Sequence, residues 1–283
     1  IETERTSDWV LSNTYVDLNL GSKFVEAGAR FEFLQHPLPG YETDFKGKGV
    51  PHFYVKGHYK NLELVVGDYY EQFGSGFVLR TYEERSLGIG NALRGARLNY
   101  KPVEGVNFKV ISGKQRRYWH HNDALVSGVD LEVGLEQFIK SMEAHSTHIT
   151  LGGSWVNKHE EADDDAIFVD ATHKLNLPEY VNAWDARVNV THKGFNLLAE
   201  YAQKSQDPSF DNKYHYGKGR VAMLSASYSQ KGMSALLQAK RSQGMSFRSR
   251  RSMNGTSSFI NHLPAFTHDQ TYALAAQYPY ATN

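Results

Sequence analysis

The chain has 283 residues, and its 31 lysines and arginines balance its 31 aspartates and glutamates, so the formal net charge is zero. This balance argues against nucleic acid as the main partner, because phosphate neutralisation requires a basic excess. The lack of cysteine excludes disulfides and thiolate metal sites, and no apolar run reaches the length of about 18 residues that a transmembrane helix requires.

Apolar and polar residues alternate with a period of two along most of the chain. The segment 24–33 places Val25 and Phe31 on one face and Glu26 and Arg30 on the other, and residues 128–136 and 183–191 repeat the pattern. Such alternation predicts strands with one apolar and one polar face. Roughly thirteen strands are expected, centred near residues 15, 29, 55, 66, 98, 109, 130, 151, 187, 199, 225, 238 and 275.

Short and long connections alternate between these strands. Tight turns are expected at residues 20–23, 59–62, 102–105, 192–195 and 230–233, with a somewhat longer one near 139–146. Long polar connections are expected at residues 35–50, 72–93, 114–123, 157–181, 203–218 and 243–269. This rhythm is typical of an up-and-down barrel with short periplasmic turns and long extracellular loops, whereas a soluble Greek-key sandwich has no need of it.

The sequence therefore predicts an all-β fold, an up-and-down antiparallel transmembrane β-barrel, as a single outer-membrane domain over residues 1–283. A soluble, curved sheet with a solvated charged face is the alternative. A bacterial barrel normally has an even number of strands and starts on the inside. The expected thirteen strands start outside, so we expect the barrel in this chain to be partial, with strands missing at both ends.

The two faces of the strands have different expected surroundings. In a barrel the apolar face meets lipid and the polar face lines the lumen. The residues expected to face lipid are Ala27, Phe31, Leu98, Phe108, Val129, Leu131, Trp184, Val188, Leu197, Leu237 and Ala239. Those expected to line the lumen are Asp17, Glu26, Arg30, Glu32, Lys56, His58, Glu63, Arg97, Lys109, Asp130, Glu132, Asp185, Arg187, Glu200 and Lys240.

Three segments carry a resemblance to a known family. They are GDYYEQFGSGFVLRTYEERSLGIGNALRGARLNYKP (67–102), GKQRRYW (113–119) and LPAFTHDQTYALAAQYPYAT (263–282). They resemble an uncharacterised family of outer-membrane proteins from Bacteroidota, known only as a domain of unknown function. The resemblance covers most of the chain and implies a β-barrel in the bacterial outer membrane. It implies no reaction and no established ligand.

The first of these segments contains the candidate site. Its Gly-Ser-Gly sequence lacks the lysine of a P-loop, and GIGNALRG lacks the βαβ surroundings of a dinucleotide site. One hypothesis is an inward-folded loop whose charges form an ion-pair network and a pore constriction. An ordinary exterior loop with solvated charges is the other. The residues of the candidate network are Arg80, Glu83, Glu84, Arg85, Arg94 and Arg97.

Other charged clusters point less clearly to a site. The carboxylates within residues 160–165 lack calcium-loop spacing, so a solvated acidic loop is expected there. Arg248, Arg250 and Arg251 are expected to form a solvated basic run rather than a contact with lipopolysaccharide or a partner. The histidine pairs 120–121 and 145/148 are poor metal ligands, and no catalytic triad is recognisable. We therefore expect no enzyme activity, cofactor or metal.

Three functional classes remain open. The first is an integral outer-membrane channel or transport-like protein with an inward-folded charged loop. The second is an accessory barrel subunit of a multi-protein outer-membrane complex for protein export or barrel assembly. The third is a soluble glycan-binding β protein. Outer-membrane lipid and lipopolysaccharide are the expected partners of the first two, with surface lipoproteins or other outer-membrane proteins as further candidates. The sequence names no solute.

Overall fold

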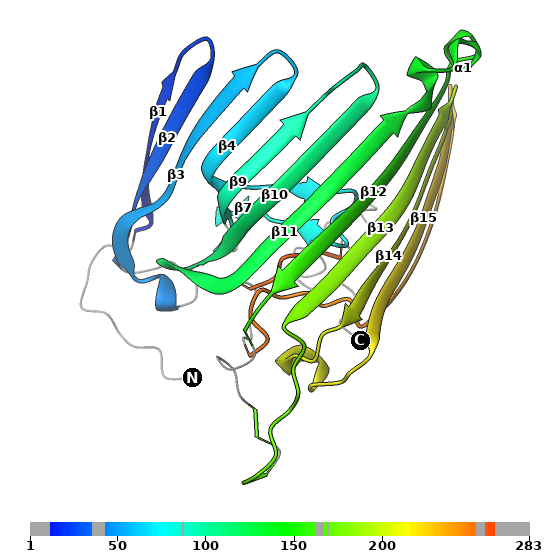
Figure 1. Cartoon of the computed structure of the whole chain (residues 1–283). Coiled ribbons are helices and arrows are strands. Elements are labelled where there is room, and N and C mark those ends of the chain that lie inside the picture. The colour runs from blue at the N-terminus through cyan, green and yellow to red at the C-terminus, as the bar shows by residue number, and fades with distance from the viewer. Residues whose placement is uncertain are drawn as a thin grey trace.

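One large antiparallel sheet dominates the structure (Figure 1). The computed structural model describes residues 12–35, 43–85, 88–161, 167–168, 170–252 and 258–263. The 12-stranded sheet has the order β1-β2-β3-β4-β9-β10-β11-β12-β13-β14-β15-β16, so each of its strands pairs with the next one along the chain. These strands are Thr14–Gly21, Val25–Leu34, Gly47–Tyr59, Leu62–Tyr69, Leu93–Tyr100, Val106–Arg117, His120–Gly134, Thr147–His159, Tyr180–His192, Phe195–Gln206, Lys218–Gln230 and Met233–Gln243.

The remaining elements are short. Between β4 and β9 lie two small hairpins, formed by β5 (Gln72–Phe73) with β6 (Leu79–Arg80) and by β7 (Glu83–Glu84) with β8 (Ile89–Gly90). The helical elements are η1 (Thr43–Phe45), η3 (Leu135–Gln137), α1 (Lys140–Ala144) and η4 (Phe210–Asn212). Within the described ranges, no helix is long and apolar enough to cross a membrane.

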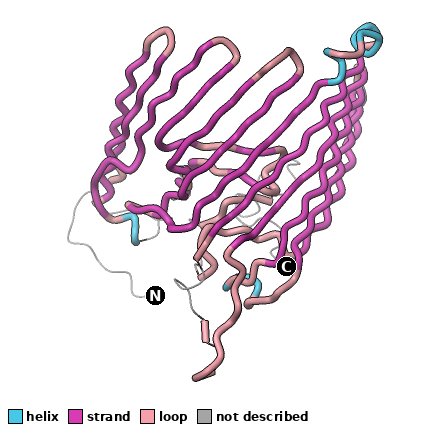
Figure 2. The backbone as a smooth tube through the Cα atoms, viewed as in Figure 1, coloured by secondary structure: helices cyan, strands magenta, loops and turns pink. Residues whose placement is uncertain are grey.

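The all-β, up-and-down antiparallel architecture predicted from the sequence is confirmed. Twelve of the predicted strand centres fall within strands of the sheet, and the one near residue 275 lies outside the described residues. The predicted short turns lie at one end of the sheet and the connections predicted to be long lie at the other (Figure 2). The turn at 139–146 contains α1.

The predicted long connection at residues 114–123 is wrong. Strand β10 continues to Arg117 and β11 begins at His120, so only Tyr118 and Trp119 connect them. The pairing continues to the end of the hairpin after a register shift between Lys114 and Arg116. Polar residues suggested a loop here, but Gln115 and Arg116 are buried by partners from distant parts of the chain.

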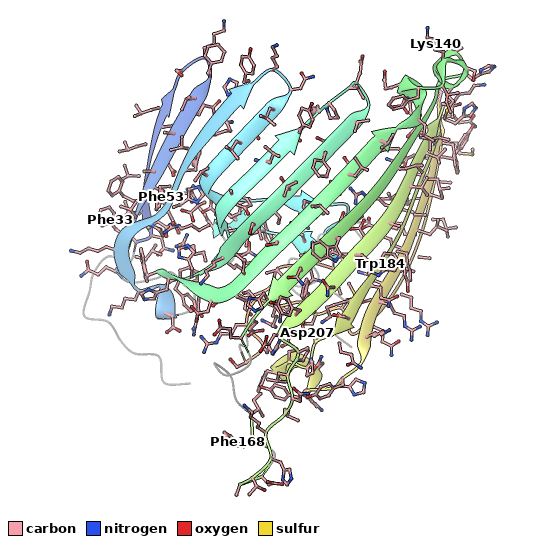
Figure 3. All side chains as sticks on the ribbon, viewed as in Figure 1. Phe33, Phe53, Lys140, Phe168, Trp184 and Asp207 are labelled. Carbon is pink, nitrogen blue, oxygen red and sulfur yellow. The ribbon has the colours of Figure 1, made fainter. Side chains whose placement is uncertain are left out.

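The two faces of the sheet differ as the alternation predicts. Leu131 and Leu237 are 44% and 64% exposed, although leucine is among the residues most often buried in water-soluble proteins. On the other face, Asp130 and Glu200 are 1% and 3% exposed. The sheet therefore presents apolar side chains outward and encloses charged ones, the reverse of the arrangement in a soluble protein. Figure 3 shows the side chains projecting from both faces.

Candidate functional site

Two loops lie within the curve of the sheet, and the first begins where β4 ends. This first inner loop comprises residues 70–92 and contains both small hairpins. Gly74 and Gly76 have φ values of +51° and +91°, a region that side chains with a Cβ rarely adopt, so they permit the sharp turn at its tip. The Gly76 N–H donates to the Phe73 carbonyl at 2.9 Å. The chain therefore reverses within four residues at the tip.

The tip of the first inner loop contacts the inner face of β14. The Ser75 N–H donates to the two carboxylate oxygens of Glu200 at 3.1 and 3.3 Å. A Cβ atom added at Gly74 would lie 2.8 Å from Glu200 Oε1. The backbone of the loop therefore lies in close contact with the Glu200 and Arg187 side chains of the sheet.

Apolar side chains fix the same loop to the wall. Phe73, Phe77 and Leu79 are completely buried in one cluster with wall residues that include Val126 and Val156. At about 25 cal/mol for each Å² of buried apolar surface, three such side chains stabilise this arrangement by several kcal/mol. The first inner loop is therefore a packed element and not a solvated excursion.

A second inner loop follows β16 and interlocks with the first. We use this name for residues 244–252 and 258–263, of which Met245, Phe247 and Ile260 are completely buried in the same cluster. Backbone hydrogen bonds join the two loops, from Arg80 N–H to the Ile260 carbonyl and from His262 N–H to the Gly76 carbonyl. We call the two inner loops together the plug.

Glu71 ties the start of the first inner loop to two strands. Arg97 Nε on β9 and Lys109 Nζ on β10 donate to its carboxylate at 2.6 and 2.9 Å. Arg97 also lies 3.1 Å from Glu63 on β4. Of the six candidate network residues, Arg97 thus serves as an anchor on the wall, although its partner Glu71 was not among those six.

A second ionic group holds the hairpin of β7 and β8. Glu83 pairs with Arg30 of β2 and lies 3.5 Å from Arg85. Arg30 in turn donates to Asp17 at 2.6 Å, and Arg85 stacks on the Tyr15 ring with its guanidinium carbon 4.4 Å from the centroid. The hairpin is therefore attached to the first two strands of the sheet.

The remaining candidates lie apart from these two groups. Arg94 donates to Asp68 at 2.7 and 2.9 Å within the wall itself. The Arg80 guanidinium lies 4.9 Å from the centre of the Tyr82 ring. Glu84 is exposed and pairs across its hairpin with Ile89. The structure thus places the six residues in several small clusters, and a common pore constriction formed by them stays a prediction.

An acidic cluster surrounds Arg187 on the inner face of β13. Its guanidinium donates to Asp130 at 2.5 Å, to Asp185 at 2.8 Å and to Glu132 at 3.0 Å. Glu200 lies beside this group, because Gly74 approaches both Glu200 and Arg187. One cation thus faces four carboxylates in the lumen. Within the described residues, no set of three potential ligands could hold a metal ion.

The expectation of a solvated basic run at residues 248–251 is wrong for two of its three arginines. Arg248 and Arg251 are 3% and 1% exposed, whereas Arg250 is half-buried. Arg248 pairs with Asp211, and Arg251 lies 3.3 Å from Glu160. Glu160 is itself buried, so the expected solvated acidic loop is wrong there also. The acidic positions 163–165 lie outside the described residues.

Two buried lysines complete this ionic cluster at the loop end of the sheet. Lys158 Nζ lies 2.9 Å from Glu160 and 3.0 Å from Asp207, and Lys204 Nζ lies 3.2 Å from Asp207. Burial alone would raise the pKa of Asp207, but Lys158 and Lys204 outweigh it and lower the pKa below its usual value. The carboxylate therefore remains charged and links β12 and β14 to the second inner loop.

The sequence reasoning missed the apolar part of the site. The inward side chains of Val65, Ile111, Val126, Val156 and Val221 are all buried against the plug. A signal was present, because strict alternation breaks into continuous apolar runs near the loop ends of strands, as in Leu64-Val65-Val66 and Ala124-Leu125-Val126. A strand that is apolar on both faces is expected where it is covered on both faces.

Comparisons with known proteins complete the description. A family model described as "Family of unknown function (DUF6029)" matches residues 1–283. No curated protein matches. The match agrees with the predicted resemblance to an uncharacterised family, and the expected Bacteroidota origin stays an expectation.

Solved structures with some likeness come from Pseudomonas and Acinetobacter species. Pseudomonas aeruginosa OccK3 (OpdO) is 12% identical, with a TM-score of 0.41, over 87% of this chain and 76% of that chain. Acinetobacter baumannii OccAB1 is 10% identical, with a TM-score of 0.38, over 77% and 70%. A BenF-like porin from Pseudomonas fluorescens Pf-5 is 10% identical, with a TM-score of 0.30, over 82% and 86%. Because these scores lie below 0.5, the proposals below depend on this chain's own residues.

Proposed function

We propose that this chain, which belongs to the Family of unknown function (DUF6029), forms much of the wall and the closing plug of an outer-membrane β-barrel channel for small solutes. The observation that carries the proposal is the combination of an apolar outer face, a charged inner face and a plug packed inside. A solvated sheet would have no reason to expose so many large apolar side chains on one face.

The outer face has the extent that a membrane requires. On β13, the outward residues from Trp184 to His192 span eight residues, or about 27 Å at 3.4 Å per residue. A tilt of about 40° reduces this height to roughly 20 Å, close to the apolar band of about 25 Å on outer-membrane barrels. Trp184 and Tyr201 lie near one edge of this band, and Phe195 and Tyr228 near the other. Aromatic residues at both edges are typical of membrane interfaces.

The inner face has the character of an aqueous passage at its turn end. Lys56, Glu63, Arg97 and Lys109 point inward there and retain 18–31% exposure of their side chains. Charged groups of both signs on the inner face suit polar solutes, since each group remains hydrated or paired. The plug occupies the loop end, so the passage is closed in this conformation and opens when the plug moves.

Single-channel conductance in planar bilayers tests the proposal. Residues 74–79 of the full protein are replaced by a glycine-serine linker of the same length, which removes Phe77, Val78 and Leu79 from the plug core. We expect a larger or more frequent conductance than in the wild type, and greater sensitivity of cells to bulky antibiotics. An equal replacement of residues 170–175 in the loop between β12 and β13 is the control and is expected to change neither.

A correctly folded linker variant with unchanged conductance would contradict the channel proposal. Strand content measured by far-ultraviolet circular dichroism, together with the elution volume in detergent, establishes whether the variant is folded. If both proteins conduct equally, the plug does not close the passage; if neither conducts, the channel has no support and the sheet with its plug is better explained as a scaffold.

A second candidate function is an accessory subunit of a multi-protein outer-membrane complex. The loop between β12 and β13 extends well beyond the sheet, and Phe168 near its tip is 65% exposed (Figure 3). Phe210 in η4 is 52% exposed at the same end. Exposed aromatic side chains are frequent anchors in protein interfaces. A pull-down from native membranes tests this role, with Phe168→Ser expected to release a specific partner and Lys231→Ser to retain it.

A further inference from the structure

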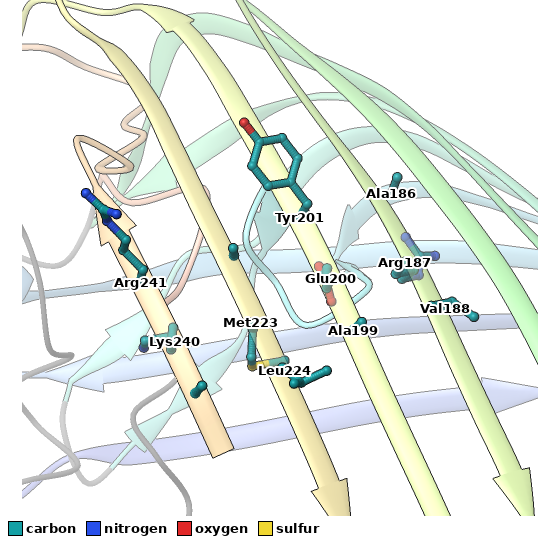
Figure 4. Close-up of a pocket in the computed structure, with 12 residues that line it drawn as sticks. Ala186, Arg187, Val188, Ala199, Glu200, Tyr201, Met223, Leu224, Lys240 and Arg241 are labelled. Atoms are coloured by element: carbon teal, nitrogen blue, oxygen red, sulfur yellow. The ribbon is translucent and has the colours of Figure 1, made fainter. Parts of the chain in front are cut away.

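A shallow apolar depression of about 690 Å³ lies on the outer face across β13 to β16 (Figure 4). Four alanines, one from each strand, form its floor: Ala186, Ala199, Ala222 and Ala239. Tyr201 and Leu224 project beside them, while Glu200 lies behind the ribbon on the inner face. The volume is within the range of about 300–1,000 Å³ that is usual for sites of small molecules.

The strand register explains why this face is hollow. Ala199 pairs with Leu224, and Ala222 pairs with Tyr201, so small and large side chains alternate both along and across the strands. On the next strand, Ala239 lies opposite Leu224 and continues the floor. Methyl groups thus alternate with large side chains across the four strands, which leaves a shallow apolar groove on this face.

Two arginines lie at the loop side of this groove. Arg241 lines it directly, opposite Ala222, and Arg220 lies one outward position further toward the loops, opposite Gln243. Both are exposed, and within the described ranges neither forms an ion pair with a carboxylate. The two residues are diagonal neighbours on paired strands, with Cα atoms about 7–8 Å apart. Two guanidinium groups at this spacing can share one phosphate, each with a pair of hydrogen bonds.

We propose that this groove binds a phosphorylated membrane lipid, with one acyl chain on the alanine floor and a phosphate between Arg220 and Arg241. The inference rests on the proposed function, since it requires the outer face to lie in a membrane. An arginine on a lipid-facing surface is unfavourable unless its side chain reaches the interface or an anion. The arginines' position at the loop end assigns the lipid to the leaflet on that side, while Gln203 and Gln243 provide further polar groups at the same level.

Lipid retention measured by native mass spectrometry tests this inference. The full-length protein in detergent is titrated with lipid A, with its dephosphorylated form, and with phosphatidylethanolamine. Wild type is expected to prefer the two phosphate-bearing lipids, lipid A and phosphatidylethanolamine, to dephosphorylated lipid A. Arg220→Gln and Arg241→Gln are each expected to weaken the binding of these two lipids about tenfold, as for the loss of a charge-assisted hydrogen bond. The dephosphorylated lipid is expected to bind wild type and the arginine variants equally.

Matched variants separate the groove from the face around it. Ala222→Leu fills the floor and is expected to lower binding of both forms of the lipid, whereas Ala226→Leu, on the same face of β15 but outside the groove, is not. Lys231→Gln, in the turn at the other end of the same strands, is expected to bind like wild type. Equal binding by all variants, or equal loss at Ala222 and Ala226, would overturn the inference.

Failure of this inference is distinguishable from failure of the proposed function. Carbonate extraction of cells shows whether the protein is an integral membrane protein. A protein that resists extraction yet shows no preference for the phosphorylated lipid contradicts only the lipid site. A protein released by carbonate contradicts the membrane proposal, and the lipid site with it.

Discussion

The backbone N–H of Ser75 donates to the carboxylate of Glu200, a residue 125 positions later in the chain. This contact joins the tip of the first inner loop to the inner face of β14, in the middle of the wall. Glu200 is also beside Arg187, which binds Asp130, Asp185 and Glu132. The position of the plug is therefore coupled to the charge distribution of the lumen.

Replacement of Glu200 by alanine is expected to loosen the plug. The Ser75 N–H then loses its acceptor in a partly buried setting, which costs up to about 1–3 kcal/mol. We expect a lower free energy of unfolding in detergent and more frequent channel openings in bilayers. Glu200→Gln retains one acceptor oxygen and is expected to show a smaller effect. Glu104→Ala, in an exposed turn, is the control. If Glu200→Ala matched wild type in both measurements, the contact would have no role in holding the plug.

Replacement of Glu71 by glutamine tests the anchor at the other end of the same loop. Arg97 and Lys109 both pair with this carboxylate, and all three side chains are at most 20% exposed. Loss of the negative charge leaves two partly buried cations near each other, so we expect a destabilisation of about 1–3 kcal/mol. Glu26→Gln breaks the exposed pair with Lys56 and is the matched control, with little expected effect. Chemical denaturation compares the two, and equal midpoints would argue against an anchor at Glu71.

The strands and their facing were predictable because they depend on local patterns. Alternation identified twelve strands, and Leu131 and Trp184 face outward as predicted. The candidate site was predictable only in part. One of the two hypotheses for this segment placed Arg97 in an ion-pair network that holds a loop, but its main partner Glu71 was not singled out, because reach across strands depends on register.

The errors share one physical cause. Arg116 and Arg251 are polar in sequence and were expected in solvated loops, yet each is buried by a partner from a distant segment. Arg116 pairs with Glu32, 84 residues earlier, and Arg251 with Glu160, 91 residues earlier. Burial of an arginine is favourable only when such a partner is in place. A single sequence without spatial information does not show which partner that is.

Acid is expected to weaken the contact between the two inner loops through His262. Burial, and after it the positive charges of Arg80 and Lys240, lowers the pKa of His262 to about 4. In the unfolded chain the pKa of histidine is about 6.5. Between these values the unfolded state binds a proton that the folded state does not, so the free energy of unfolding decreases as the pH falls from about 6.5 to 4.

Denaturation midpoints at pH 8 and pH 5 measure this effect. Wild type is expected to lose more stability between the two than His262→Gln, which does not titrate in this range. All other titrating groups are common to the two proteins and cancel in the comparison. An equal loss in both proteins would show that His262 stays neutral in the unfolded chain or charged in the folded one, contrary to its lowered pKa.

The side of the membrane on which each connection lies is testable by cysteine labelling. The chain has no native cysteine, so a single introduced thiol gives an unambiguous signal. Phe168→Cys, in an exposed long loop, is expected to react with an impermeant reagent on intact cells, and Asn61→Cys, in a short turn, only after permeabilisation. The opposite order would reverse the proposed orientation.

The two faces of β11 provide the sharpest test of the membrane assignment. Leu131 is 44% exposed on the outer face, and its neighbour Asp130 is 1% exposed on the inner face. Leu131→Arg would place a charge on the outer face three residues before the end of β11, and it is expected to cost up to about 2–4 kcal/mol, the cost of an arginine at the bilayer midplane. Leu131→Ile is the matched control. On a solvated surface the arginine would instead be harmless, so unchanged stability in Leu131→Arg would remove the membrane from the proposed function.

Asp130→Asn is also expected to destabilise the protein, but for a different reason, because it weakens the hydrogen bonds from Arg187 and Ser154. The two variants are separable by medium: transfer from detergent to a lipid bilayer should increase the cost of Leu131→Arg and leave that of Asp130→Asn unchanged.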